Sequence, residues 1–113
     1  MDSQHDSTEV VGVYLTFPDE AAADRIASDL VSSRLAACVN IFGTGRSVYR
    51  WDDEIVSGPE VFAWAKTTRS RLEELQARVT ELHPFEVPCV VAYPAQGGLP
   101  TYLDWVAMAT QEK

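Results

Sequence analysis

The chain has 113 residues, of which 46% are hydrophobic and 23% charged, a composition typical of a single globular domain with one apolar core. Its formal net charge of −8 repels phosphate backbones, which argues against nucleic acid as a partner. No stretch approaches the roughly 20 apolar residues of a membrane helix, so we expect no membrane partner either.

Residues 1–9 are predicted to form a disordered polar tail, and residues 10–113 a single domain. The tail has neither the basic region nor the apolar region of a signal peptide. The two cysteines, Cys38 and Cys89, form neither a CxxC pair nor a zinc-finger spacing. Without signal-peptide features, we expect a cytoplasmic protein with both thiols reduced. The predicted strands that carry the two cysteines also lie too far apart for a disulfide within one subunit.

The first predicted strand is Val10–Phe17, a run of apolar and β-branched residues of strand length. Pro18 and the two acidic residues after it suit the first turn of a helix. Apolar residues then recur at helical spacing over 22–31, which predicts a helix with one apolar face.

A long, irregular hairpin is predicted next. Ala36–Phe42 is typical of a strand, two glycines interrupt it, and extended character resumes at Val48–Trp51. Asp52-Asp53 indicates a turn, and Val61–Thr67 is a clear third strand.

The second half of the chain starts with another helix. Residues 67–70 offer several N-cap candidates, of which Ser70 matches the spacing of a capping box with Glu73, and Pro84 ends the helix. Val87–Tyr93 is predicted as the fourth strand, and Pro100 opens a last helix.

The order β-α-β-β-α-β plus a terminal helix predicts an α+β fold of the ferredoxin-like sandwich type with an extra C-terminal helix. The expected strand order in the sheet is 4-1-3-2, with both main helices on one face. The second face then has no helix of its own.

The strands do not alternate apolar and polar residues, as a face exposed to water would require. Phe62 and Trp64 of the third strand point away from Val61, Ala63 and Ala65, so both faces of that strand are apolar. We interpret Phe62 and Trp64 as an oligomer interface, because a large exposed apolar patch usually marks an interaction surface. The alternative is that the last helix folds back and covers this face within one monomer.

Several short motifs occur along the chain in an order that is specific to one protein family. The chain resembles the CutA divalent-cation tolerance family over about residues 10–110, nearly its whole length. The motifs that carry the resemblance are AACVNI (Ala36–Ile41), SVYRW (Ser47–Trp51), the spaced set Glu60, Trp64, Lys66 and Thr67, HPFEVP (His83–Pro88) and YLDW (Tyr102–Trp105).

The resemblance implies a ferredoxin-like homotrimer with the architecture of the PII signalling proteins and a role in tolerance of copper and other divalent cations. Its implied partners are further copies of the chain and metal ions, with copper or another divalent cation as ligand and no obligatory cofactor. The alternative function is a PII-like signalling or scaffold trimer that binds a small anionic ligand or a partner protein in clefts between subunits.

His83 and Cys89 are the candidate metal ligands. His83 matches the family motif, imidazole suits copper and zinc, and the Cys89 thiolate suits Cu(I). Each also has a structural interpretation, His83 as a histidine at a helix C-terminus and Cys89 as a small buried hydrophobic residue. The chain departs from copper-binding relatives at Leu15, where some have a cysteine, and at Cys89, where many have a glutamate.

A second candidate site comprises Tyr49, Trp51, Glu60 and Lys66, which the resemblance places near clefts between subunits. Lys66 is predicted to bind an anion there, with Glu60 as its partner. The alternative is a structural salt bridge at the interface.

An enzymatic function is not expected, because the chain has no nucleophile elbow, P-loop or HExxH motif. Phe62 and Trp64 also occupy positions that bind RNA bases in other βαββαβ domains. The acidic charge and the absence of a basic RNP1 pattern argue against that function.

Overall fold

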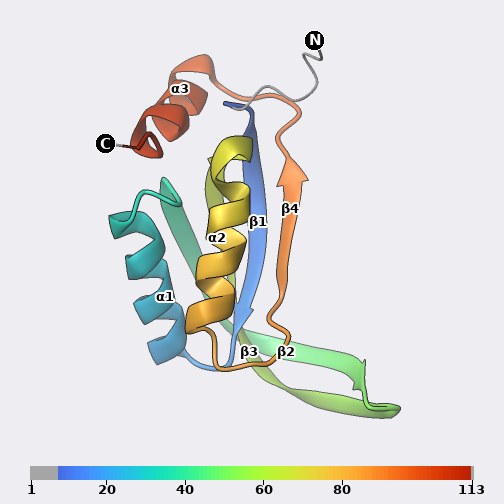
Figure 1. Ribbon diagram of the computed structural model, residues 1–113. Coiled ribbons are helices and arrows are strands. Elements are labelled where there is room, and N and C mark those ends of the chain that lie inside the picture. Colours follow the sequence, from blue (N-terminus) through green and yellow to red (C-terminus); the bar gives the residue numbers. More distant parts are fainter. Residues whose placement is uncertain (1–7, 113) are drawn as a thin grey trace.

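The predicted ferredoxin-like α+β fold with an additional C-terminal helix is confirmed (Figure 1). The computed structural model describes residues 8–112, so most of the predicted tail lies outside the described part of the chain. The elements in chain order are β1 (Val10–Phe17), α1 (Glu20–Ser32), β2 (Cys38–Trp51), β3 (Glu54–Thr68), α2 (Arg69–Leu82), β4 (Val90–Pro94) and α3 (Pro100–Ala109).

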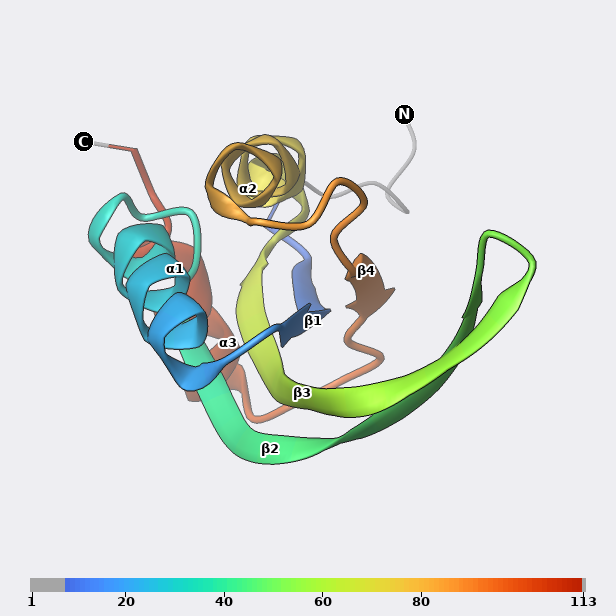
Figure 2. The same ribbon diagram turned by 90° about the horizontal axis from the view of Figure 1, so that it is seen from below.

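The four strands form one antiparallel sheet in the order β2-β3-β1-β4, which is the predicted order read from the other edge. Helices α1 and α2 lie side by side on one face of this sheet (Figures 1 and 2). We call the opposite face, which neither helix covers, the open face.

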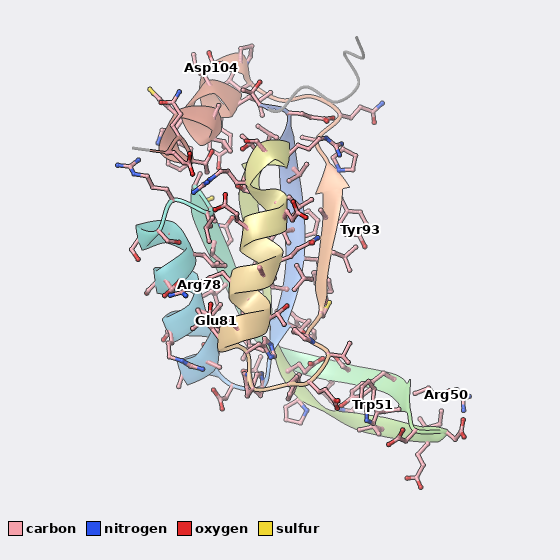
Figure 3. All side chains as sticks on the ribbon, in the orientation of Figure 1. Arg50, Trp51, Arg78, Glu81, Tyr93 and Asp104 are labelled. Carbon is pink, nitrogen blue, oxygen red and sulfur yellow. The ribbon has the colours of Figure 1, made fainter. Side chains whose placement is uncertain are left out.

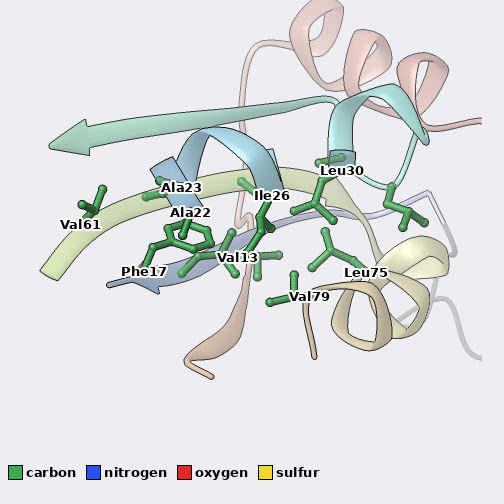
Figure 4. Packing of buried hydrophobic residues seen from close by; sticks show 14 of the residues in the cluster. Val13, Phe17, Ala22, Ala23, Ile26, Leu30, Val61, Leu75 and Val79 are labelled. Atoms are coloured by element: carbon green, nitrogen blue, oxygen red, sulfur yellow. The ribbon is translucent and has the colours of Figure 1, made fainter. Parts of the chain in front are cut away.

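The main core lies between the sheet and these two helices (Figure 4). Alternate residues of β1 and β3, such as Val13 and Ala63, are completely buried there. Ile26 from α1 and Val79 from α2 meet them and are also completely buried. Each large aliphatic side chain buried in this way contributes on the order of 1.5–3 kcal/mol to folding.

The two main helices begin differently. Asp19 caps α1, because its carboxylate accepts a hydrogen bond of 2.8 Å from the backbone N–H of Ala22. Of the N-cap candidates predicted at 67–70, Thr68 occupies the N-cap position of α2, whereas the predicted Ser70–Glu73 capping box is wrong. The helix starts at Arg69 with Thr68 as its N-cap residue, so Ser70 already lies within the first turn.

The β2–β3 hairpin is longer and more continuous than predicted. The expected break after Phe42 is wrong, because Gly43, with φ of 107°, accommodates a register shift and the ladder resumes at once. Pairing continues to Trp51 and Glu54, and the predicted turn at Asp52-Asp53 is confirmed. Residues 44–60, here called the arm, curve out beyond the sheet (Figures 1 and 2).

The fourth strand is shorter than predicted. It begins at Val90 rather than Val87, and its pairing with β1 starts opposite Leu15. Pro88, two residues before the strand, has no N–H to donate to the ladder.

A row of aromatic side chains runs across the open face. Tyr14 stacks on Phe62 with ring centroids 6.5 Å apart and lies 6.4 Å from Trp64. Trp64 stacks in turn on Tyr93, 5.8 Å away, and Tyr93 remains 50% exposed. The sequence-based assignment of Phe62 and Trp64 to the face opposite the helical layer therefore agrees with the structure.

Helix α3 covers only one end of the open face. Its buried Val106 packs against Val10 and Ala37, where β1 begins and β2 is about to begin. Tyr102 and Trp105 of the same helix remain about 40% exposed. The alternative, in which the last helix covers this face within one subunit, therefore holds at one end of the sheet only.

The packing of Trp64 in this aromatic row leaves no room for a side chain at position 12. A Cβ atom at Gly12 would lie 2.5 Å from Nε1 of Trp64, whereas Gly58 has nothing within 4 Å of the same position. We therefore expect Gly12→Ala to lower the free energy of unfolding by about 1–3 kcal/mol through overpacking. Denaturant unfolding of Gly12→Ala and of the control Gly58→Ala measures this, and an equal stability of the two variants would contradict the packing described.

Candidate binding pocket

A cavity of about 750 Å³ lies between the open face and the arm. Three segments supply its wall: β1, the arm and the loop 84–89 that connects α2 to β4. Its aromatic, acidic and thiol-bearing residues are Tyr14, Tyr49, Trp51, Glu60, Phe85, Glu86 and Cys89. We call this cavity the arm pocket.

The charge of the arm pocket is negative. Two carboxylates line it, and none of the described residues that line it is a lysine, arginine or histidine. Burial raises the pKa of the Cys89 thiol, and the nearby Glu60 carboxylate raises that pKa further, whereas a hydrogen bond with Thr16 lowers it. Burial also raises the pKa of Tyr14, with smaller contributions in the same direction from Cys89 and Glu60.

Tyr14, Glu60 and Cys89 all line the arm pocket, so a charge on one of them affects the pKa of the others. A second negative charge in this group is disfavoured because it would face an existing one in partly buried surroundings. A bound cation reverses the effect, since it attracts both the Glu60 carboxylate and a deprotonated Cys89. The arrangement therefore favours a positively charged ligand.

The wall formed by the arm is aromatic. Tyr49 and Trp51 are 44% and 48% exposed, and Trp51 lies well out along the arm in Figure 3. Aromatic faces attract cations through their quadrupole, which adds to the effect of the carboxylates. They also supply apolar area, so the pocket combines an apolar wall with few polar groups, as small-ligand sites usually do.

His83 is buried and does not line the arm pocket. Its Nδ1 accepts a hydrogen bond of 3.1 Å from the backbone N–H of Phe85, so Nε2 carries the proton. Nε2–H donates to the carbonyl oxygen of Thr16 at 2.9 Å, and the ring stacks on Phe17. Both ring nitrogens thus tie the loop 84–89 to the end of β1, and a metal could bind His83 only if one of these bonds broke.

The structure divides the second candidate site. Tyr49, Trp51 and Glu60 line the arm pocket, whereas Lys66 lies six residues beyond Glu60 on β3, about 20 Å along the strand. The Lys66 ammonium donates instead to Oδ1 of Asn40 at 2.7 Å. The carboxylate and the ammonium that the sequence suggested as partners therefore belong to different ends of the open face.

Sequence reasoning missed several residues that line the pocket, among them Tyr14, Thr16 and Phe85. Tyr14 alternates outward from the core on β1, which was visible in the sequence as an apolar residue on the second face. Its contact with the pocket depends on the curvature of the arm, and no local pattern encodes that curvature.

Metal coordination by a single chain would be sparse. Within residues 8–112, no three side chains of His, Cys, Asp or Glu lie close enough together to hold a metal ion. The arm pocket offers two donors, Cys89 and Glu60, and the charge of Glu60 raises the pKa of the Cys89 thiol. In the same part of the chain, no helix is both long and apolar enough to cross a bilayer.

Residues 11–109 match the family model described as CutA1 divalent ion tolerance protein. The chain is 46% identical over 94 residues to the divalent-cation tolerance protein CutA of Thermus thermophilus, covering 83% of this chain and 91% of the relative. It is 37% identical over 112 residues to the chloroplastic protein CutA 1 of Oryza sativa, covering 99% of this chain and 63% of that relative.

The fold is shared with solved structures of such proteins. The T. thermophilus structure matches with a TM-score of 0.88 at 43% identity, covering 90% of this chain and 99% of the other. CutA1 from O. sativa matches with the same TM-score at 38% identity, covering 95% of this chain and all of the other.

The pKa of Cys89 should respond to the charge on Glu60. In a Cys38→Ser background, where Cys89 is the only thiol, we expect Glu60→Gln to lower the pKa of Cys89 because a nearby negative charge is removed. The pH dependence of the alkylation rate measures this pKa. Glu54→Gln, which changes a carboxylate of β3 that does not line the pocket, serves as the control and should leave it unchanged. An unchanged or higher pKa in Glu60→Gln would show that the two groups do not interact.

Proposed function

The chain belongs to the CutA1 divalent-ion tolerance family, and from this premise we propose that it is a homotrimeric cytoplasmic protein that binds copper or another divalent cation weakly in the arm pocket. We propose a binding role in metal tolerance and no catalytic one. The observation that carries this proposal is the negative pocket in which a thiol and a carboxylate lie together.

Cys89 and Glu60 are the ligands we assign to this chain. A thiolate favours copper, especially Cu(I), and a carboxylate completes a mixed set of donors. A tight site needs three or four protein ligands, so two donors account for weak binding. Leu15, at the position where some relatives have a cysteine, is completely buried in the core and supplies no donor.

His83 has a positioning role in this proposal. Its two hydrogen bonds hold the loop that carries Phe85 and Glu86 against β1. The loop in turn places Cys89 at the pocket wall. The family-matched histidine is therefore proposed to shape the site, with Cys89 as the ligand.

Trimer formation is supported by the apolar surface that one chain leaves exposed. Phe42, Val48 and Ile55 on the hairpin are 71%, 66% and 63% exposed, and Tyr93 extends the aromatic row of the open face. Exposed apolar area on this scale usually marks an interaction surface. We propose that neighbouring subunits cover it, with Phe62 and Trp64 at the interface.

The anionic-ligand alternative has less support. It needs a free cationic side chain near the pocket, and the described residues that line the pocket provide none. Lys66 is already hydrogen-bonded to Asn40 at the other end of the sheet. The cytoplasmic location is proposed because Cys38 and Cys89 are both unpaired, as thiols usually are in a reducing compartment.

Anaerobic Cu(I) titration of the purified protein tests the proposed site. We expect Cys89→Ser to weaken binding by about tenfold or more, because the soft ligand is lost, and Glu60→Gln to weaken it less. Binding should strengthen as the pH rises, since the Cys89 thiol must lose its proton to bind the metal.

Cys38→Ser is the matched control, since it removes the chain's other thiol. It should bind Cu(I) as the wild type does. A Cys89→Ser variant with wild-type affinity, or a Cys38→Ser variant with an equal loss, would remove the arm pocket from the proposal.

A further inference from the structure

A second group of reactive side chains lies at the opposite end of the open face. It comprises Cys38, Asn40, Lys66 and Tyr102, and we call it the thiol–lysine cluster. The Cys38 sulfur lies 3.9 Å from Nζ of Lys66 and 3.7 Å from the hydroxyl of Tyr102. Nothing in the proposed cation binding uses these groups.

The sheet and α3 together build this cluster. Cys38 and Lys66 are direct cross-strand partners of β2 and β3, so their side chains lie on the same face. Asn40 fixes the lysine by accepting a hydrogen bond of 2.7 Å from Nζ. Helix α3 folds back over this end of the sheet and brings Tyr102 to the thiol, with Nζ of Lys66 lying 5.8 Å from its ring centroid.

An ammonium and a phenol hydroxyl thus lie within hydrogen-bond distance of one sulfur atom. The Lys66 ammonium can only donate, and the pKa of Tyr102 is raised first by its hydrogen bond with Cys38, so the phenol stays protonated. Cys38 itself is half-buried and not fully enclosed.

The two cysteines of the chain therefore have opposite surroundings. Cys89 lies in a negative pocket, where burial and Glu60 favour the neutral thiol. Cys38 lies beside the Lys66 ammonium, 3.9 Å from its sulfur, and the Tyr102 hydroxyl, 3.7 Å from it. A metal cation is attracted to the first site and repelled from the second by Lys66, whereas an uncharged oxidant meets no such barrier at Cys38.

We propose that Cys38 is an oxidation site at which a small hydroperoxide converts the thiol to a sulfenic acid, with Lys66 and Tyr102 as positioning residues. In this step the Cys38 sulfur attacks the terminal peroxide oxygen, an S–O bond forms and the O–O bond breaks. The thiol proton is transferred to the departing oxygen, which leaves as water or an alcohol. Sulfur is oxidised by two electrons, and the peroxide is reduced by two.

Lys66 and Tyr102 favour this step in two ways. Their donors stabilise the charge on the attacking sulfur, and afterwards they can hydrogen-bond the new oxygen on that sulfur. The cluster thus provides a redox-sensitive group, independent of the cation pocket, at the point where α3 packs on the sheet.

Treatment of the intact protein with hydrogen peroxide, followed by trapping with a dimedone-type probe and peptide mass spectrometry, tests the proposal. We expect the label on Cys38, forming about tenfold or more faster than on Cys89. The comparison is internal to the wild type, so it does not depend on the folding of a variant. Unfolding the protein in denaturant should bring the two rates together.

Variants test the positioning role. Lys66→Met should slow labelling of Cys38 severalfold, Lys66→Arg should restore most of the rate, and Cys89→Ser should leave it unchanged. Cys89 reacting as fast as Cys38 in the folded protein, or Lys66→Met reacting at the wild-type rate, would overturn the proposal. Because the probe does not require copper, these results stand apart from the outcome of the Cu(I) titration.

Discussion

The structure depends on the fact that two helices cover only one face of a sheet whose strands are apolar on both. Burying Val13, Ala63 and their neighbours under α1 and α2 forms the core. The same strands place Tyr14, Phe62 and Trp64 on the other face, where these two helices do not reach. Two other elements cover parts of this face. Helix α3 packs on one end of it, and the arm curves beside the other end.

The two candidate sites occupy these two ends, and their chemistry follows from what each end brings together. The arm and the loop 84–89 contribute carboxylates and aromatic rings, so Cys89 lies in negative surroundings. Strand β3 contributes Lys66 and helix α3 contributes Tyr102, so Cys38 at the start of β2 lies beside an ammonium and a phenol. One sheet thus holds two thiols with different neighbours, and we propose cation binding at one and oxidation at the other.

Local patterns in the sequence predicted much of this fold. The alternation of Val61, Ala63 and Ala65 against Phe62 and Trp64 identified both faces of β3, and the order of the elements predicted the sheet topology. The continuity of the arm was missed because Gly43 looked like a break. A glycine at positive φ also permits a bulge, and only the pairing partner across the hairpin distinguishes the two.

The sites were harder to predict than the fold, because their geometry is set by contacts between distant segments. Cys89, Tyr49, Trp51 and Glu60 were each recognised, yet their union in one pocket depends on the curvature of the arm. The separation of Lys66 from Glu60 follows from strand geometry, because the two residues lie six positions apart on β3. The two hydrogen bonds of His83 could not be inferred, since they join its ring to the backbone of Thr16 and Phe85.

We propose that the uncovered face of the sheet, with Trp64 at its centre, is an association surface. Sedimentation in dilute buffer at micromolar protein concentration measures the mass of the assembly. We expect a single species with the mass of three chains. A stable species with the mass of one chain across the concentration range would contradict it.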